Sequence, residues 1–490
     1  MSISGLLEID MLAMAGVEEI QSENRRMESQ VDWTSQRVII IGAARQGLAL
    51  ARYLVQRGAR VLVNDRQPLD RLTAAQEALA GLPVDWVGGD HPLSLLDGAD
   101  LVYISGGVPV DLPLVVEAVA RGIPVSNDSQ LFLEAAQCTV IGITGSAGKT
   151  TTTSLVGQMA QEAVRLSGAR YRQAWIGGNI GSPLIAELSH IDAQDLAVME
   201  LSSFQLEIMT RSPQVAAILN ITPNHLDRHK TMQVYTAAKA RILEYQSPND
   251  VAVLGSDDPG AWSLTRTVRG RLVSFGFKDP SPAVGTYIDG DTLFYSDNGK
   301  IIALMPRGMI RLRGEHNLLN VLAASAIALA ADLPVEAIQA GVARFTGVPH
   351  RLEFVRTWGG ADWYNDSIAT APERAIAAIR SFDEPLLLLA GGRDKDLLWE
   401  DFARLVVRRV RHVILFGEAA TKINSALELA AGRKKIAVTR CKTLEEAVGA
   451  AANMVQPGDV VLLSPGGTSF DEFRDFEERG ERFRQWVKQL

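Results

Sequence analysis

One stretch constrains the fold more than any other: VIGITGSAGKTTTTSLVG at residues 140–157, a β-branched run that turns through glycines into a threonine-rich segment. A strand that leads through a glycine loop into a helix directs backbone N–H groups and the positive helix end toward an anion. We therefore predict a phosphate-binding loop, in which Lys149 neutralises phosphate charge and Thr150 offers its hydroxyl to Mg²⁺.

The strict phosphate-loop pattern G-x-x-x-x-G-K-[ST] is not met, because Ile143 occupies the position of its first glycine. An ordinary glycine turn with a surface lysine is the alternative. The pattern G-x-x-G-K-T-T after a β-branched strand favours phosphate binding. The departure from the strict G-x-x-x-x-G-K-[ST] pattern counts only against an ordinary P-loop ATPase.

Apolar runs typical of strands alternate along the chain with segments whose apolar residues recur at helical spacing. This alternation predicts an α/β chain of three domains. We expect a Rossmann-like N-terminal domain at 37–136, and a central P-loop-type ATPase domain at 137–347 with a parallel sheet and a small β part. A second Rossmann-like, doubly wound domain is expected at 348–490. The small β part is predicted from TYIDGDTLFYSDNGKIIAL, whose Asp-Gly and Asn-Gly pairs are typical of hairpin turns. Residues 1–36 carry no motif and are expected to be a poorly ordered extension, with a docked amphipathic helix as the alternative.

Length, charge and cysteine content limit the number of domains, the kinds of partner and the cellular compartment that fit this chain. At roughly 150 residues per domain, 490 residues fit three domains. The net charge of 49 − 57 = −8 counts against nucleic acid or an anionic membrane as the main partner. Cys138 and Cys441 are the only cysteines, so a disulfide framework is not expected and a reducing cytoplasm fits. No apolar run approaches the ~20 residues that span a bilayer, so membrane insertion is not expected.

Three residues of the central domain are candidates for metal chemistry. Glu200 directly follows the strand LAVM, at a carboxyl edge where an oxygen ligand for Mg²⁺ would lie; a helix cap is the alternative. His225 lies in a proline-containing loop, four residues before His229, but the zinc pattern H-E-x-x-H fails at Leu226. Lys239 lies in an alanine-rich helical stretch, where a lone lysine usually faces solvent.

Two amides, an arginine and an acid are the next candidates. Asn317 and Asn320 share one helix face at i,i+3 spacing and could read a nucleotide or cap the helix. Arg351 and Asp366 follow the expected domain break, where they would suit a site that closes on ATP.

With these motifs in place, the chain resembles the Mur ligases, the ATP-dependent amide ligases of peptidoglycan precursor synthesis. The resemblance covers nearly everything after about residue 36. Its motifs include TGSAGKTTT, GGNIG, ELSSFQLE, TPNHLDRH, GEHNLLN, PHRLE, NDSIAT, GGRDK and SPGGTSFDEFRDFEERG. The last motif is most similar to the member that joins D-glutamate to UDP-N-acetylmuramoyl-L-alanine through an acyl phosphate. The resemblance implies these small-molecule substrates, ATP and two Mg²⁺ ions, and we expect a cytoplasmic monomer.

The resemblance also implies residue roles. Lys149, Glu200, His225 and Lys239 would be catalytic, and Thr150 would join the last three as a metal ligand, with Lys239 carbamylated. The implied ATP contacts are Gly145, Ser146, Ala147, Gly148, Lys149, Thr150, Thr151, Asn317, Asn320, Arg351 and Asp366. The implied UDP-sugar contacts are Gly42, Arg45, Gly47, Asp65, Arg66, Gly107, Asn179 and Ser202. The implied D-glutamate contacts are Thr370, Lys395, Ser469 and Phe476.

Three positions depart from the family pattern. Ser105–Val108 reads SGGV where the family usually has S-P-G, Ile368 replaces a usual lysine, and Ala371 replaces a usual asparagine. The alternatives are another Mur ligase or a folylpolyglutamate-type ligase, a catalytically inactive nucleotide-binding partner, and an NAD-dependent dehydrogenase built on residues 38–65. The dehydrogenase pattern G-x-G-x-x-G fails at Ala44.

Overall fold

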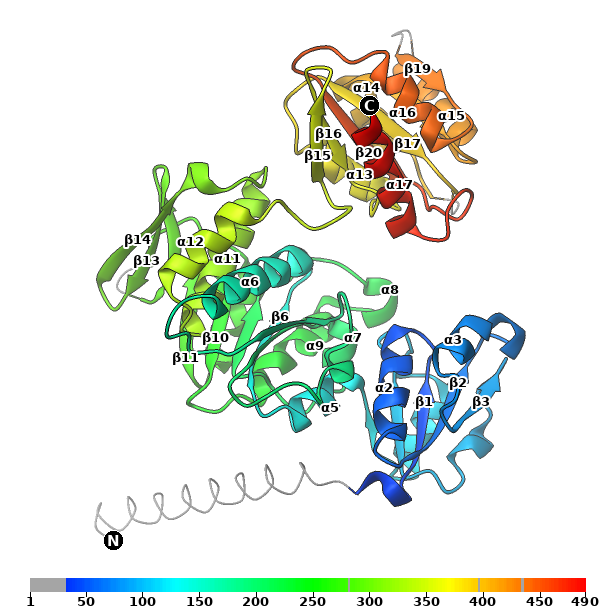
Figure 1. The fold of residues 1–490 in the computed structure, drawn as a ribbon, viewed down its shortest axis with the longest axis vertical. Helices are drawn as coiled ribbons and strands as arrows, with labels where there is room; N and C mark the ends of the chain where they lie inside the picture. The colour runs from blue at the N-terminus through cyan, green and yellow to red at the C-terminus, as the bar shows by residue number, and fades with distance from the viewer. Residues whose placement is uncertain (1–31, 281–282, 395–396, 433–435) are drawn as a thin grey trace. The chain divides into compact units, whose positions relative to one another are not determined.

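The computed structural model describes residues 32–280, 283–394, 397–432 and 436–490 (Figure 1). The expectation of a poorly ordered extension at residues 1–36 lies outside the described residues for residues 1–31. It is wrong for the remainder, because Trp33–Ser35 form a 3₁₀ helix capped by Asp32 and Trp33 is buried in the core. Two compact units divide the chain: one holds the described residues up to Ile310 together with His316–Arg344, and the other holds Arg311–Glu315 together with Phe345–Leu490.

The first unit begins with a five-stranded parallel sheet in the order β3-β2-β1-β4-β5. The apolar run after Arg37 forms its central strand, buried on both faces as a covered parallel strand should be. This arrangement confirms the Rossmann-like prediction. Its elements are η1 (Trp33–Ser35), β1 (Arg37–Ile41), α2 (Arg45–Val55), β2 (Arg60–Asp65), η2 (Leu69–Arg71), α3 (Thr73–Ala78), β3 (Val84–Gly88), η3 (Leu93–Leu96), β4 (Leu101–Ile104), α4 (Pro113–Ala120) and β5 (Val125–Ser126).

A nine-stranded sheet follows in the same unit, in the order β14-β13-β12-β11-β10-β9-β6-β8-β7. Its strands are β6 (Thr139–Thr144), β7 (Ala174–Gly178), β8 (Leu196–Glu200), β9 (Val215–Ile218), β10 (Val251–Gly255), β11 (Arg271–Phe275), β12 (Gly285–Asp289), β13 (Thr292–Asp297) and β14 (Lys300–Pro306). Its helices are α5 (Asp128–Ala135), α6 (Lys149–Val164), η4 (Leu184–Ala186), α7 (Ser203–Leu206), α8 (Leu226–His229), α9 (Met232–Glu244), α10 (Pro259–Trp262), η5 (Ser263–Thr267), η6 (Arg307–Met309), α11 (Glu315–Ala330) and α12 (Val335–Arg344).

The expected hairpins form the antiparallel end of this sheet. Strand β13 pairs antiparallel with both β12 and β14. The turn between β13 and β14 places Asn298 at φ 50° and Gly299 at φ 87°, the left-handed pair that a tight Asn-Gly hairpin requires. The prediction of a small β part is confirmed.

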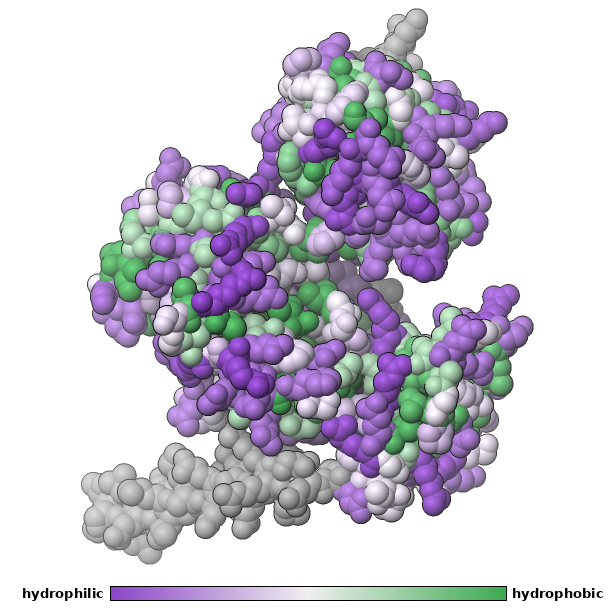
Figure 2. Space-filling model, viewed as in Figure 1, coloured by the Kyte–Doolittle hydropathy of each residue, from purple (hydrophilic) through white to green (hydrophobic). Residues whose placement is uncertain are grey.

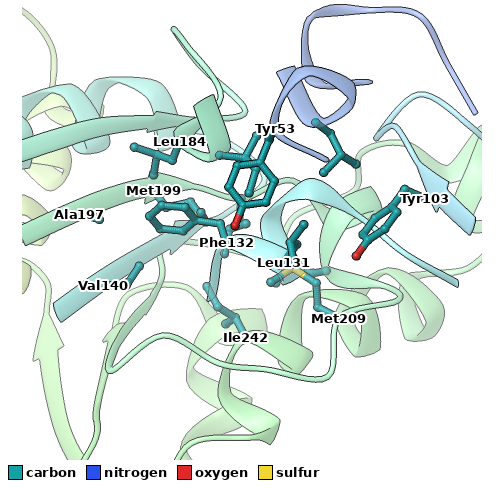
Figure 3. Close-up of a cluster of buried hydrophobic side chains, with 14 of the residues drawn as sticks. Tyr53, Tyr103, Leu131, Phe132, Val140, Leu184, Ala197, Met199, Met209 and Ile242 are labelled. Atoms are coloured by element: carbon teal, nitrogen blue, oxygen red, sulfur yellow. The ribbon is translucent and has the colours of Figure 1, made fainter. Parts of the chain in front are cut away.

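One apolar core joins the two sheets of the first unit (Figure 3). Leu131 and Phe132 of α5 are buried in the same cluster as Tyr53 of α2 and Met199 of β8. Because α5 supplies apolar side chains to this cluster, the segment between the two sheets is part of the packed interior and does not behave as a free linker.

The second unit is a six-stranded sheet in the order β15-β16-β20-β17-β18-β19, in which only the edge pair β15–β16 is antiparallel. This topology confirms the second Rossmann-like prediction. Its elements are β15 (Glu353–Trp358), β16 (Ala361–Asn365), α13 (Pro372–Ile379), β17 (Leu386–Gly391), α14 (Glu400–Arg409), β18 (Val410–Phe416), α15 (Ala420–Ala431), β19 (Ala437–Arg440), α16 (Leu444–Ala452), β20 (Val460–Gly466) and α17 (Phe476–Gln489).

Among the described residues, the helices are all too short or too polar to traverse a lipid bilayer. Hydrophilic and hydrophobic residues are interspersed over the face drawn in Figure 2.

The departure at Ala371 has a structural consequence at the start of α13. Ala371 is the N-cap residue, with the extended backbone (φ −145°, ψ 147°) that capping residues adopt, but it has no side chain to accept a hydrogen bond. Replacing Ala371 with Asn should therefore stabilise this unit by about 0.5–2 kcal/mol. Chemical denaturation monitored by fluorescence would measure the gain. A variant no more stable than the parent would show that the helix end is already satisfied in another way.

Candidate active site

The predicted phosphate loop connects β6 to α6 and is shaped by Gly148. Gly148 is the N-cap of α6 and adopts φ 81°, a conformation that favours glycine. A Cβ on Gly148 would lie 2.4 Å from the Asn320 side-chain oxygen. Both the backbone angle and the available space therefore require glycine at this position.

The neighbouring loop after β9 anchors the phosphate loop. The Ser146 hydroxyl donates to the Thr222 carbonyl at 2.9 Å and lies 3.0 Å from the Tyr235 hydroxyl. The side chain of Asn220 accepts from the Ala147 N–H at 2.8 Å and donates to its carbonyl at 3.1 Å. The loop is thus held in shape by contacts outside itself, as a preorganised anion site requires.

Helix α11 brings the predicted amides to this loop. Asn320 is buried, accepts from the Thr152 hydroxyl at 3.4 Å, and donates to the Asn317 side-chain oxygen at 3.0 Å. Asn317 and Asn320, which the sequence places on one helix face, are therefore in direct contact. Asn320 packs against the start of α6, so the structure places it beside the phosphate loop.

Lys149 folds back onto its own loop. Its Nζ donates to the Gly145 carbonyl at 2.7 Å and to the Ser146 carbonyl at 3.3 Å. These bonds hold an ammonium group at the loop, where a bound phosphate would be attracted.

Glu200 ends β8 and is 1% exposed. Its Oε1 accepts a 2.8 Å hydrogen bond from Asn179, and its Oε2 is buried without a hydrogen-bond partner. The helix-cap alternative is wrong, because Ser202 is the N-cap of α7 and forms a capping box with Gln205. A buried carboxylate oxygen without a partner is costly, and a bound cation would satisfy it.

Lys239 is 1% exposed, so the solvent-facing alternative is also wrong. Its Nζ donates to the Gly145 carbonyl at 2.9 Å and to the Thr144 hydroxyl at 3.2 Å, and it lies 4.9 Å from the centre of the Tyr235 ring. Burial lowers the pKa of Lys239 to about 6, and the Lys149 charge acts in the same direction. Lys239 is therefore largely neutral at pH 7, the state that reacts with electrophiles.

His225 is exposed at the N-cap of α8, at the left-handed angle φ 53°. Its ring meets the Phe204 ring edge-on, with centroids 5.0 Å apart. His229 is buried, and its Nε2 lies 2.9 Å from the Ser203 hydroxyl. The two histidines thus have different environments. Among the described residues, no group of three or more His, Cys, Asp or Glu side chains is arranged to hold a metal ion.

In the first sheet, Asp65 joins the two turns that the sequence singles out. One carboxylate oxygen accepts from the Ala43 N–H at 2.8 Å, and the other accepts from the Gln67 N–H at 2.9 Å. Gly42 and Gly47 pack so closely that a Cβ on Gly47 would lie 2.0 Å from the Gly42 carbonyl oxygen. Arg45 and Arg66 are exposed beside these turns.

In the second unit, Asp366 directly follows β16 and is 4% exposed. It accepts from the Ser464 hydroxyl at 2.8 Å and from the Leu352 N–H at 3.2 Å. Burial raises the pKa of Asp366 to about 7, while the Arg351 charge opposes the shift.

Three of the four D-glutamate candidates follow strands of the six-stranded sheet: Thr370 follows β16, and Ser469 and Phe476 follow β20. Ser469 is buried, Thr370 and Phe476 are half-buried, and Lys395 lies outside the described residues. The alternative of Ser469 as a helix cap is wrong, because Asp475 caps α17. The core alternative for Phe476 is not supported, because that ring is only half-buried.

Sequence reasoning missed two buried side chains that shape these sites. Tyr235 contacts both Ser146 and Lys239, and its spacing of four residues before Lys239 was the available signal. Arg479 is fully buried and donates to the Ser367 hydroxyl at 3.0 Å, the Ser367 carbonyl at 2.8 Å and the Gly467 carbonyl at 3.1 Å. It ties the loop after β16 to the loop after β20, and burial lowers its pKa to about 10.

A glycine loop held by outside contacts, a buried acid with an open oxygen, and a buried lysine with a lowered pKa lie together at one edge of the nine-stranded sheet, as a site for phosphate groups would require. Family models identify the class more closely. The Mur ligase MurD-like N-terminal domain matches residues 36–127, the Mur ligase middle domain matches 143–328, and the Mur ligase glutamate ligase domain matches 350–467.

Two curated relatives, each named UDP-N-acetylmuramoylalanine--D-glutamate ligase, match almost end to end. The protein of Symbiobacterium thermophilum is 41% identical over 456 residues, covering 93% of this chain and 98% of the relative. The protein of Pelotomaculum thermopropionicum is 40% identical over 460 residues, covering 94% and 99%. The chain belongs to the Mur ligase family, whose members are ATP-dependent ligases.

Solved structures share the fold at lower identity. UDP-N-acetylmuramate-alanine ligase MurC of Thermotoga maritima aligns with a TM-score of 0.56 at 18% identity, covering 92% of this chain and 99% of that one. MurF of Acinetobacter baumannii aligns with a TM-score of 0.55 at 18% identity, covering 94% and 98%.

The close packing at Gly148 gives a testable prediction. Gly148→Ala should raise the KM for ATP at least tenfold, because the new methyl group would displace the Asn320 amide from the loop. Steady-state phosphate release measures this change. Gly168→Ala is the matched control, since Gly168 also has a left-handed φ of 74° but nothing lies within 4 Å of its Cβ position. Equal effects of the two substitutions would attribute the loss to backbone strain instead of the Asn320 contact.

Proposed function

We propose that this chain joins D-glutamate to UDP-N-acetylmuramoyl-L-alanine in an ATP-dependent step of peptidoglycan precursor synthesis. The near full-length relatives of that name support the choice of substrates. At the site itself, the proposal rests on the convergence of Lys149 and Lys239 on the Gly145 carbonyl, with the Glu200 charge close enough to act on the pKa of Lys239.

The proposed reaction has two steps. The carboxylate of UDP-N-acetylmuramoyl-L-alanine attacks the γ-phosphorus of ATP, the bond to ADP breaks, and an acyl phosphate forms. The amine of D-glutamate then attacks the acyl carbon, an amide forms, and inorganic phosphate leaves with the bonding electron pair while the amine loses a proton. Lys149 and the loop N–H groups offset negative charge on the transferring phosphoryl group, the main requirement of such a step.

The donor set of the central sheet fits Mg²⁺. The Glu200 Oε2 lacks a partner, and the Thr150 hydroxyl and the His225 ring are the other proposed protein ligands. Two ions, when bound, would supply Lewis-acid stabilisation of the phosphate oxygens. Lys239 would contribute only after its neutral amine adds CO₂ and releases a proton, because the resulting carbamate is an oxygen ligand whereas an ammonium group is not.

The other candidate residues take their roles in this proposal from the family resemblance. Asp65 and Arg66 would contact the uridine end of the nucleotide-sugar, with Asn179 and Ser202 nearer the sugar. Arg351 and Asp366 would contact ATP. Thr370, Lys395, Ser469 and Phe476 would contact D-glutamate.

Phosphate release provides the direct test. The purified chain should release phosphate only when ATP, Mg²⁺, a UDP-muramoyl substrate and its matching amino acid are all present. UDP-N-acetylmuramoyl-L-alanine with D-glutamate should give the highest kcat/KM. A preference for another UDP-muramoyl acceptor, or for a folate acceptor with L-glutamate, would assign the chain to a different ligase.

Lys239 gives the second prediction for function. Lys239→Met should lower kcat by about 100-fold or more, the scale of losing one transition-state electrostatic contact. The same substitution should raise Tm at pH 7 in CO₂-depleted buffer. The pKa of Lys239 is about 6 in the folded chain and 10.5 in the unfolded chain, so between these values the unfolded chain binds the extra proton. The resulting loss of folding stability becomes smaller as the pH rises toward 10, and the Tm advantage of the variant should shrink with it.

The matched control is Lys300→Met, because Lys300 is exposed. That control should change neither kcat nor the pH dependence of Tm. Full activity of Lys239→Met would remove Lys239 from the mechanism, and a lower Tm at pH 7 would contradict the burial argument.

Lys395 gives a third prediction, drawn from the family resemblance. Lys395→Ala should raise the KM for D-glutamate about tenfold or more, because a charge-assisted hydrogen bond contributes roughly 1.5–3 kcal/mol. The KM for ATP should change little. An equal loss for both substrates, or no loss, would place the amino-acid pocket elsewhere.

A further inference from the structure

The segment Ser105–Val108 follows β4 and carries the departure SGGV. Its first residue is well anchored: the Ser105 N–H donates to the Ile41 carbonyl at 3.0 Å, and the Ser105 hydroxyl donates to the Gly42 carbonyl at 3.1 Å. Two consecutive glycines follow, and glycine backbone has more conformational freedom than any other. The Val108 N–H donates to the Ser105 carbonyl at 2.8 Å and closes a turn over the two glycines. With glycine at both central positions such a turn allows two orientations of its central peptide, and a further contact is needed to select one.

Arg228 of α8 supplies that constraint. Its guanidinium donates to the Val108 carbonyl at 2.6 Å and to the Gly106 carbonyl at 3.3 Å. These are the two backbone oxygens on either side of Gly107. Arg228 lies within the motif TPNHLDRH between His225 and His229, and the sequence alone indicates no role for it.

The guanidinium is itself held in place. It lies 4.1 Å from the centre of the Phe204 ring and 3.3 Å from the Glu207 carboxylate, and its side chain is 19% exposed. Phe204 also contacts His225 edge-on and stacks on His229 at 5.2 Å. One aromatic ring thus supports both the arginine that reaches Ser105–Val108 and the histidine proposed as a metal ligand.

This geometry sets the direction of one N–H group. In a trans peptide the C=O and the N–H point in opposite directions. Because the Gly106 carbonyl points toward Arg228, the Gly107 N–H points away from it. Gly107 is exposed, and a Cβ on it would meet no atom within 4 Å.

We propose that Arg228 is a positioning residue that orients the Gly107 N–H toward the diphosphate of the nucleotide-sugar substrate. The inference rests on the proposed function for its ligand. Arg228 does not contact the ligand in this arrangement; it acts through the backbone of Ser105–Val108. Its position on the loop of His225 means that the nucleotide-sugar segment and the proposed metal loop share one support.

Calorimetric titration with UDP-N-acetylmuramoyl-L-alanine, without ATP or metal, tests the proposal. Arg228→Met keeps the apolar stem over Phe204 but removes every donor, and it should weaken substrate binding about tenfold, or 1.4 kcal/mol. Arg228→Lys keeps a charge and a donor and should recover part of the loss. The KM values for ATP and D-glutamate should stay near those of the parent chain.

Arg241→Met is the matched control. Arg241 also donates to a backbone carbonyl, that of Met209 at 3.0 Å, and lies 5.7 Å from the centre of the Tyr245 ring. It should bind the nucleotide-sugar as tightly as the parent chain. Thermal melting of all three variants would identify any that fail to fold. If Arg228→Met fails to fold, Arg228→Lys still decides the question.

The outcomes separate the inference from the proposed function. No binding by the parent chain would refute the proposed substrate. Binding by the parent chain with the same Kd in Arg228→Met would overturn only the role of Arg228. An equal loss in Arg228→Met and Arg228→Lys, or a parallel rise in all KM values, would show that the arginine is merely structural.

Discussion

The parallel pairing of β6 with β8 on one side and β9 on the other is the constraint on which the central site depends. Parallel strands end at the same edge of a sheet, so three loops that are distant in the sequence emerge side by side. The first carries the phosphate loop, the second begins at Glu200, and the third contains Asn220 and leads to His225. If any one of these strands were shifted by one residue, its side chains would lie on the opposite face of the sheet, and the site residues would no longer lie together.

The sequence predicted what is local and patterned. The glycine loop, the position of Glu200 at a strand end, and the Asn298–Gly299 hairpin each depend on a few adjacent residues, and each is present. Residue roles were harder to predict where burial decides them. Lys239 is typical of an exposed helical lysine by pattern, yet tertiary packing places it beneath the phosphate loop and lowers its pKa.

Contacts that bridge distant segments were out of reach for the same reason. Arg228 and Arg479 both use guanidinium donors to hold backbone carbonyls of loops that lie elsewhere in the sequence. Sequence periodicity does not identify the carbonyl that such an arginine will contact, because every residue has a backbone carbonyl. Arginine suits this role, since its planar fork presents several donors and can reach two acceptors at once.

The shared core around α5 bears on how the chain can be divided. Cutting the chain at residue 136 would separate Leu131, Phe132 and Tyr53 from Met199 and the other members of the apolar cluster that follow residue 136. Each fragment would expose to water a surface that is now interior, which promotes aggregation. The fragment up to residue 136 is therefore a poor candidate for isolated expression, although its sheet has the topology of a complete Rossmann-like domain.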